Sequence, residues 1–332
     1  MSYQFPERVL ITSGHEVGGL KTFAQGLAEG FMAMNIPTEL IRPSKIWTRR
    51  RDLRDPRILK VLSTTAVFAS PFARRAICVM HGTPSAEHQG WWKLGALVTM
   101  FKLASICSGV QMVAVSDYVA VHMQTIFNIS TDAVIHNPVK SIFFELVSHP
   151  AIERPYITYV GRLNRAKNMH RLIPVIVSLV NETPGLRVCI VGEGELRSEL
   201  KSIVKGDPRY EFPGNLDSAG VRDQLRRSKV FISGNPTEPF GIVFLEALSQ
   251  GCIVAMPACG GGVEIALNQI GKRVHLLPLS FDHNQTLEVL RAALNSDSCP
   301  ISMGAFNVKS VASSYLNVDA RFDAQGIFHR TI

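Results

Sequence analysis

A glycine, an arginine and a lysine stand close together at the end of an apolar, β-branched run in the second half of this 332-residue sequence. The run 156–160 has the composition of a strand, and Gly161, Arg162 and Lys167 follow it. Arginine forms paired hydrogen bonds to phosphate oxygens, and lysine adds a compact point charge. The pattern predicts a loop that binds a polyanion such as a diphosphate. A solvated loop with ordinary surface cations is the alternative.

The segment 234–248, GNPTEPFGIVFLEAL, is the most informative part of the chain. Its Pro-Phe-Gly turn opens an apolar helix directly after a predicted strand, so the first free amides and the helix dipole should attract an anion. Glu238 and Glu246 flank the turn. Glu246 stands among apolar residues, where a carboxylate costs free energy unless a donor satisfies it. The paired hydroxyls of a ribose or sugar are suitable donors, and a partly exposed helix face is the alternative. The amides expected at the anion belong to Gly241, Ile242 and Val243.

Three weaker motifs also follow predicted strands. The stretch 14–19, GHEVGG, precedes a helix, and its glycines would let backbone amides approach a phosphate. Its spacing is not that of the dinucleotide fingerprint, and a tight turn without a ligand explains it equally well. The stretch 258–264, ACGGGVE, repeats the arrangement, again with a simple tight loop as the alternative. His81 follows the run 76–80 and could reach a cleft, although a lone histidine is more often structural.

Charge is concentrated in one segment. The chain carries +8 overall, with 46% hydrophobic and 19% charged residues, which is a composition able to bury sizeable cores. Residues 42–60 hold eight basic and two acidic residues, so this segment carries +6 of the total. Without a zinc-finger spacing, an aromatic RNA-binding strand or a basic zipper, the sequence does not indicate a nucleic-acid-binding protein. A basic segment indicates an anionic membrane surface or a phosphorylated substrate as its partner, and a solvated basic loop is the alternative.

Other features concern location and cofactors. The six cysteines form no Cys-x-x-Cys pair, which favours reduced thiols in a cytoplasmic protein. The N-terminus passes directly into a predicted strand, so no signal peptide is expected. The apolar stretch 91–107 is short for a membrane span, and we expect a buried helix, with a membrane-facing amphipathic helix as the alternative. No aspartate pair or zinc spacing suggests a metal ion, so charge neutralisation is expected from Arg, Lys and helix ends.

Strands alternate with helices along the whole chain, which predicts βαβ units and parallel sheets. The prolines around 138–155 mark the expected boundary between two doubly wound domains that face each other, with ligands bound beyond the carboxyl ends of the strands, in the cleft between the domains. The expected strands are 8–12, 38–41, 76–80, 111–115, 133–136, 156–160, 187–191, 229–232, 253–256 and 273–276. The expected helices include 20–34, 118–127, 169–180, 195–204, 220–227, 242–249 and 286–294.

Taken in order, these motifs resemble the family-4 retaining glycosyltransferases of GT-B fold. The resemblance covers nearly the whole chain and is densest over 156–265. Its most specific part is the pair Glu238-x7-Glu246 around Pro-Phe-Gly, together with Gly161-Arg162-x4-Lys167. The other matching positions are Gly18-Gly19, His81, Ser116, Asn137-Pro138, Val191-Gly192-Glu193-Gly194, Gly214 and Gly261-Gly262-x-Glu264.

The resemblance implies roles for these residues. Arg162 and Lys167 would bind the donor diphosphate, and Glu246 would hold the ribose hydroxyls. Glu238 would face the donor sugar and phosphates, with the amides of Phe240, Gly241 and Ile242. In the other domain, Gly18 and Gly19 would approach the phosphate, and His81 would lie near the donor sugar. Leu216 is a weaker match to the loop that contacts the base.

The resemblance also implies an organisation and an activity. It predicts an acceptor-side domain over 1–150, a donor-binding domain over 151–310, and a helix over 311–332 that crosses back to the first domain. The activity would be metal-independent transfer of a hexose-type sugar, with retention, from a nucleotide-diphosphate sugar to a saccharide or lipid-linked saccharide. The expected setting is bacterial lipopolysaccharide, O-antigen or capsule and exopolysaccharide assembly, in the cytoplasm or peripherally on the cytoplasmic face of the membrane. A nucleotide-sugar 2-epimerase and a non-catalytic membrane-associated scaffold are the alternatives.

The sequence also departs from the family pattern. The first domain is short, Asn137-Pro138 stands where Asn-Gly is commoner, and three glycines at 260–262 replace two. These departures concern the acceptor more than the donor.

Overall fold

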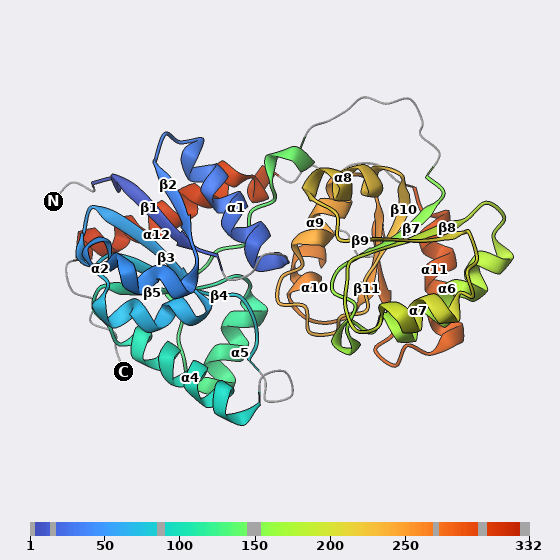
Figure 1. The fold of residues 1–332 in the computed structure, drawn as a ribbon, viewed down its shortest axis with the longest axis horizontal. Coiled ribbons are helices and arrows are strands. Elements are labelled where there is room, and N and C mark those ends of the chain that lie inside the picture. The colour runs from blue at the N-terminus through green and yellow to red at the C-terminus, as the bar shows by residue number, and fades with distance from the viewer. Residues whose placement is uncertain are drawn as a thin grey trace. The chain divides into compact units, whose positions relative to one another are not determined.

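The computed structural model describes residues 4–13, 18–84, 90–144, 154–267, 272–297 and 304–325. The chain divides into two compact units, Met1–Lys140 with Gly304–Ile332, and Ser141–Met303 (Figure 1). Each unit contains a six-stranded parallel sheet with helices packed on it, which confirms the expected α/β class. The units divide at Lys140 and Met303, somewhat before the expected positions 150 and 310.

The sheet of the first unit has the strand order β2-β1-β3-β4-β5-β6, with every described pair parallel. The order reverses between β1 and β3, which makes the carboxyl ends of these two strands a topological switch point. The elements are β1 (Arg8–Thr12), α1 (Gly19–Met32), β2 (Thr38–Ile41), η1 (Pro43–Arg49), α2 (Arg50–Arg54), β3 (Ile58–Ser63), η2 (Thr64–Phe72), β4 (Ala76–Met80), α4 (Trp91–Ser105), β5 (Val110–Ala114), α5 (Asp117–Phe127), β6 (Ala133–Val134), η6 (Gly304–Phe306) and α12 (Val308–Gln325).

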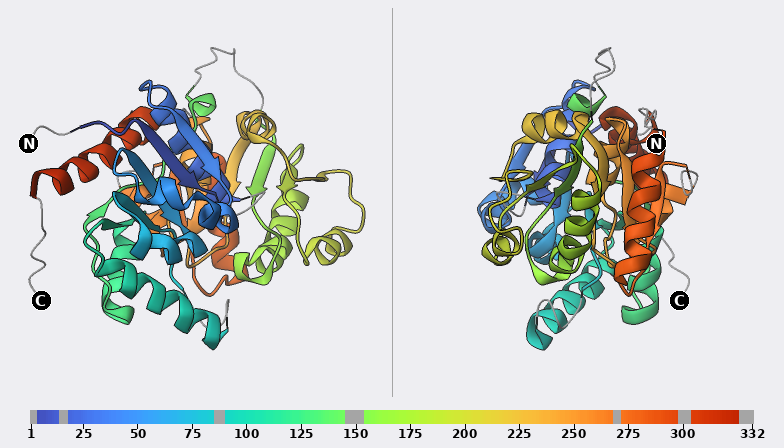
Figure 2. Two further views of the ribbon diagram at one scale, coloured as in Figure 1. Left: turned by 60° about the vertical axis from the view of Figure 1, so that its left-hand side comes forward. Right: turned by 90° about the vertical axis from the view of Figure 1, so that its right-hand side faces the viewer.

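Helix α12 belongs to the first unit, although it comes from the end of the chain. It packs alongside α1 (Figure 2). The guanidinium of Arg75 forms a salt bridge of 2.8 Å with Asp319, whose side chain is only 2% exposed. The Gln111 side-chain amide donates to the carbonyl of Val318 at 2.7 Å. These buried polar contacts fix the helix against the amino-terminal ends of β4 and β5.

The sheet of the second unit has the order β12-β11-β10-β7-β8-β9, and its strands are also parallel. Its order reverses between β7 and β10, so the switch point lies at the carboxyl ends of these strands. The elements are η3 (Ser141–Phe143), β7 (Tyr156–Val160), η4 (Arg165–Lys167), α6 (Met169–Glu182), β8 (Arg187–Val191), α7 (Arg197–Ile203), β9 (Tyr210–Gly214), α8 (Ser218–Arg226), β10 (Ser228–Ile232), α9 (Ile242–Ser249), β11 (Ile253–Pro257), α10 (Gly261–Ala266), β12 (Val274–Leu277) and α11 (His283–Asn295).

Local sequence accounts for most of these elements. The central strands are short apolar runs, and helix α6 buries residues at helical spacing from Met169 to Val180. Polar side chains cap two of the helices. Ser116 accepts a hydrogen bond from the amide of Val119, and Asp217 accepts one from the amide of Gly220.

Two strands, β3 and β9, were not predicted from the sequence. Strand β3 carries Lys60, which looks like the last member of the basic segment, yet this side chain is fully buried. Its ammonium donates to the carbonyls of Asp55 and Arg74 at 2.5 Å each, and burial lowers its pKa to about 8. Strand β9 lies at the sheet edge, where Pro213 is tolerated.

The expectation of a buried helix over 91–107 is wrong. A helix does form, as α4 (Trp91–Ser105), but only Met100, Phe101 and Ala104 are buried. Trp91 and Trp92 are 79% and 94% exposed.

Candidate functional site

The strongest sequence motifs meet at the switch point of the second unit. Arg162 and Lys167 follow β7, and Glu238 follows β10, the neighbouring strand. Open parallel sheets bind ligands beyond the carboxyl ends of the strands where the strand order reverses. The fold therefore brings together two loops that are about 70 residues apart in the sequence.

Lys167 and Glu238 form the polar centre of this site. The Lys167 ammonium lies 2.7 Å from Oε2 of Glu238, and the Asn235 side-chain amide donates to the same oxygen at 2.7 Å. The Lys167 and Glu238 side chains are 29% and 21% exposed, so both groups remain accessible to a ligand. The carboxylate is thus held in place by two donors from two different loops.

Three asparagines that the sequence reasoning assigned no role support this centre. Asn164 caps the short helix η4 and accepts a hydrogen bond from the amide of Lys167. Asn168 donates to the carbonyl of Gly234 at 3.0 Å, which joins the two loops. Asn235 positions Glu238. Sequence spacing could have indicated two of these roles. Asn164 and Asn235 each stand three residues before the charged residue that they support, which is a spacing typical of helix caps and turns.

Arg162 has an exposed guanidinium, and no ion pair involves it within the described ranges. Its carbonyl accepts a hydrogen bond of 2.9 Å from the Tyr159 hydroxyl. The pKa of Tyr159 is raised, chiefly by burial and further by the negative charge of Glu238, whereas the charge of Arg162 opposes this rise. Arg162 and Glu238 therefore both act electrostatically on the Tyr159 phenol. Because the Arg162 side chain is exposed, it is available to an anion.

Helix α9 begins at this site with a conformation that requires glycine. Gly241 has φ +86°, and an added Cβ would lie 2.4 Å from Cδ2 of Phe244. The first amides of a helix have no carbonyl partner one turn earlier, which leaves those of Ile242 and Val243 available to an anion. Glu246 lies one turn further along α9 and is 7% exposed.

The glycine-rich stretch after β11 supports the turn that carries Glu238. The amide of Gly261 donates to the Glu238 carbonyl at 2.7 Å. At Gly260, where φ is +74°, an added Cβ would lie 2.5 Å from that same carbonyl oxygen. At Gly262 it would lie 2.4 Å from the Phe244 ring. The close packing of these loops explains the run of three glycines.

Leu216 lies apart from this centre. It follows β9, which is two strands away from β7, so about 10 Å of sheet separates the two strands. Its side chain is half-buried and packs over Gly220 of helix α8. The contact of Leu216 with a nucleotide base remains a prediction.

The first unit carries Gly18, Gly19 and His81 at the carboxyl ends of its own strands. Gly18 precedes helix α1 with φ +109°, and an added Cβ at Gly18 or Gly19 would meet no atom within 4 Å. The remainder of the predicted glycine loop, 14–17, lies outside the described residues. At the nearby switch point, the hydroxyl of Ser63 donates to the carbonyl of Thr12 at 2.9 Å, which joins β1 to β3.

His81 follows β4 and is held by packing. Its ring lies 4.4 Å from that of Phe23 in an edge-on arrangement. Its Nε2 is buried and has no hydrogen-bond partner within the described part of the chain. Burial lowers the pKa of His81 to about 3, so the imidazole is neutral at pH 7.

Two further observations concern ions and membranes. Across the described residues, no group of three or more His, Cys, Asp or Glu side chains is placed to hold a metal ion. No helix in the same ranges is sufficiently long and apolar to cross a bilayer.

Comparison with known proteins relates the second unit to a described family. Residues 146–278 match the family model described as glycosyl transferases group 1. Over 109 residues the chain is 28% identical to the sulfoquinovosyl transferase SQD2 of Arabidopsis thaliana, a match that covers 33% of this chain and 20% of that protein. The chain covers between 20% and 48% of the length of the first curated relatives that it matches.

Solved structures extend the comparison to the whole fold. HepE of Anabaena, crystallised with UDP and glucose, has a TM-score of 0.64 and 14% identity, and the match covers 96% of this chain and 98% of HepE. WaaG, a glycosyltransferase involved in lipopolysaccharide biosynthesis, has a TM-score of 0.66 and 13% identity, with 95% of each chain covered.

The two α/β units with parallel six-stranded sheets therefore share the fold of these structures, which is the GT-B fold. Within the unit Ser141–Met303, residues 146–278 match glycosyl transferases group 1.

Proposed function

We propose that this protein is a retaining glycosyltransferase of family 4 that moves a hexose-type sugar from a nucleotide-diphosphate sugar to an acceptor hydroxyl. The observation that carries the proposal is the convergence of Arg162, Lys167 and the start of α9 at one switch point. Glu246 lies one turn into the same helix. This set offers two cations and free amides to a diphosphate, and a carboxylate to a ribose.

The chemistry follows from where charge develops. As the bond from the sugar to the diphosphate breaks, the sugar becomes oxocarbenium-like and negative charge grows on the departing phosphate. Groups that bind this charge more strongly in the transition state than in the ground state accelerate the reaction. Arg162, Lys167 and the amides of Phe240, Gly241, Ile242 and Val243 are placed to do this. Because these groups supply the neutralising charge, we propose that no metal ion or other cofactor takes part.

Lys167 can hold its present partner and a donor at the same time. An ammonium has three N–H donors, and the structure shows one of them directed to Glu238. A phosphate oxygen can accept another without breaking the ion pair. Glu238 is then fixed beside the phosphates, where it can accept hydrogen bonds from the donor sugar.

In the first unit, Gly18 and Gly19 present the start of helix α1 to a phosphate. A neutral His81 would bind a sugar hydroxyl through hydrogen bonding and not through charge, because burial holds its pKa low. These roles depend on residues at the carboxyl ends of β1 and β4.

The acceptor is proposed to be a saccharide or a lipid-linked saccharide in bacterial lipopolysaccharide, O-antigen or capsule assembly, on the cytoplasmic side of the membrane. Support comes from the described role of WaaG, whose likeness to this chain is one of fold. The donor nucleotide is proposed to be UDP or a related diphosphate, in line with the UDP bound in HepE.

The test is a donor screen by nucleotide release, with purified protein, a panel of UDP-, GDP- and ADP-sugars, and a bacterial lipid extract as the source of acceptor. We expect one nucleotide class to be released, with or without EDTA, and an anomeric configuration preserved in the product. Release of no nucleotide from any donor would count against the proposal. Conversion of UDP-GlcNAc to an epimer without acceptor would favour the epimerase instead.

A further inference from the structure

Helix α4 exposes an apolar stripe along its whole length. Its 15 residues include two lysines and no acidic residue. Trp92, Ala96, Thr99 and Leu103 are exposed and follow one another at spacings of four, three and four residues, which places them on one face of a helix. Ile106, directly after the helix, is 78% exposed and continues the stripe.

Another side of α4 attaches the helix to its unit. Met100, Phe101 and Ala104 are buried, and the helix packs on η2 and β5. The two lysines flank the exposed stripe. At about 100° per residue, Lys93 lies about 100° to one side of Trp92, and Lys102 lies about 80° to the other. Long lysine side chains in such positions can keep their charge in water while the stripe is covered.

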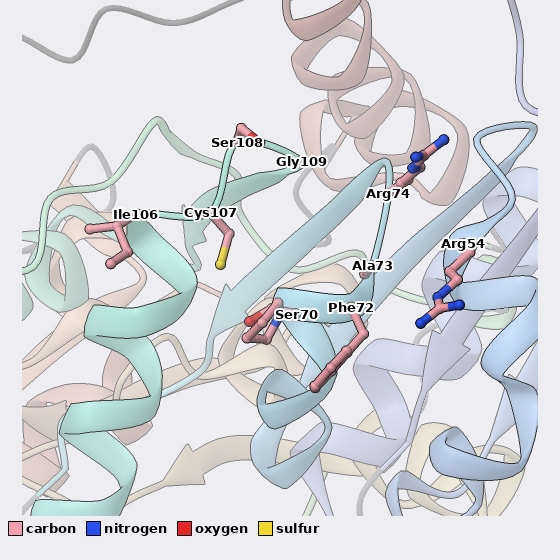
Figure 3. Close-up of a pocket in the computed structure, with 10 residues that line it drawn as sticks. Arg54, Ser70, Phe72, Ala73, Arg74, Ile106, Cys107, Ser108 and Gly109 are labelled. Carbon is pink, nitrogen blue, oxygen red and sulfur yellow. The ribbon is translucent and has the colours of Figure 1, made fainter.

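A basic hollow adjoins the carboxyl-terminal end of α4 (Figure 3). Its cavity volume is about 670 Å³, and its walls include Arg54, Arg74, Ser70 and the segment 106–109. Ser70 is 1% exposed, and its buried hydroxyl has no hydrogen-bond partner in the described parts of the chain. Two arginines therefore line the hollow, and an unpartnered hydroxyl is buried in its wall.

The basic segment 42–60 contributes fewer free charges than its sequence suggested. Arg49 pairs with Glu39 and Asp52, Arg57 pairs with Asp55, and Lys60 is buried. Within the described ranges, the basic side chains without an ion pair include Lys45, Arg50, Arg51 and Arg54. Helix α2 contains the last three, and its Arg54 lines the same hollow as Ile106 at the end of the stripe, so the hollow connects these charges to the stripe.

We propose that this surface, formed by the α4 stripe, the hollow and the free arginines of α2, docks onto a bilayer that contains anionic lipids. The apolar stripe would enter the boundary between headgroups and acyl chains, as interfacial helices do. Arg54 and Arg74 would bind a lipid phosphate in the hollow, and the lysines would face neighbouring headgroups. The anchor is thus α4, and segment 42–60 supplies only part of the charge.

The charges favour a lipid surface over a second copy of the chain. Two copies that met through this face would bring lysines and arginines of the same sign together, with no acidic residue on α4 to compensate. An anionic membrane complements both the apolar stripe and the positive rim. Membrane docking and sugar transfer are tested separately, because vesicle binding is measured without a nucleotide sugar.

The experiment measures binding of the full chain to vesicles of phosphatidylcholine, alone or mixed with phosphatidylglycerol. Trp92→Gln/Leu103→Gln removes two apolar residues from the stripe while keeping good helix formers. Its control, Val121→Gln/Ile126→Gln, makes the same change on exposed residues of α5. Arg54→Glu/Arg74→Glu reverses the charge of the hollow. Its control is Lys201→Glu/Lys272→Glu, which makes the same change in charge on exposed residues of the second unit.

We expect the protein to bind mixed vesicles and to bind pure phosphatidylcholine far more weakly. Each test variant should lose about tenfold or more in partition coefficient, and each control should stay within about twofold. Circular dichroism checks that the variants remain folded. Equal binding by the Trp92/Leu103 variant and its control would overturn the proposal. Equal binding to both kinds of vesicle would also overturn it. A dimer that forms without vesicles and is abolished by the Trp92/Leu103 substitutions would do the same.

Discussion

Replacing Lys167 with alanine should separate its proposed role in catalysis from its contribution to stability. The ammonium is 2.7 Å from Glu238 and 29% exposed, so its interactions are partly screened by water. At an effective dielectric constant of about 20, a unit charge about 4 Å away interacts with it by about 4 kcal/mol. Arg162 and the α9 amides would retain part of that stabilisation of the phosphate. We therefore expect a loss of about 2.7–4 kcal/mol of transition-state stabilisation, or about 100- to 1,000-fold in turnover.

The same substitution should affect folding only slightly. Ion pairs with partly exposed side chains contribute about 0–1 kcal/mol, so the Tm should fall by less than about 4 °C. The assay is nucleotide release at saturating donor, together with thermal unfolding of the same preparation. Arg165→Ala is the matched control, because Arg165 lies in the same loop, is 68% exposed, and pairs with Glu199 only at 3.6 Å. Unchanged turnover in Lys167→Ala, or an equal loss in Arg165→Ala, would refute the phosphate-binding role.

Three further predictions address the rest of the site. Glu246→Gln should raise the KM for the donor by about tenfold or more, because a charged hydrogen bond contributes about 1.5–3 kcal/mol, and an unchanged KM would contradict the ribose contact. Gly241→Ala should lower the free energy of unfolding by about 2 kcal/mol or more, because φ is positive there and the added Cβ would lie 2.4 Å from the Phe244 ring. In Gly19→Ala the added Cβ would meet no atom within 4 Å, so the free energy of unfolding should stay nearly unchanged. Denaturant titration measures both variants. His81 should make folding sensitive to acid. Its pKa is about 3 when folded against 6.5 when unfolded, so unfolding takes up a proton between these values. Its stability contribution is then complete above pH 6.5 and falls by about 1.4 kcal/mol per pH unit below it. Denaturant midpoints should converge between the wild type and His81→Asn as the pH falls, and parallel curves would show that His81 is not responsible.

The sequence by itself determined the parts of the molecule that depend on local order. Apolar runs followed by glycines and helix caps defined the strands, loops and helices, because strand burial, turn conformation and capping are short-range effects. The same local patterns drew attention to Arg162, Lys167, Glu238 and Glu246. Local patterns failed for β3, where Lys60 interrupts the apolar run, although its ammonium is satisfied by two carbonyls from elsewhere in the fold.

Only the tertiary structure decided which of these parts meet. The contact between Lys167 and Glu238 spans 71 residues and exists because the sheet order reverses between β7 and β10. Asn168 became part of the site through loop packing, which no spacing in the sequence reveals. The glycines at 260–262 stood out in the sequence, but only the fold placed them against the turn that carries Glu238. Helix α4 is the clearest case. Its apolar residues are spread around the whole circumference of the helix, and its two lysines do not define a single polar face, so the sequence does not show which side packs on the protein. The fold leaves the side of α4 that carries Trp92 and Leu103 open.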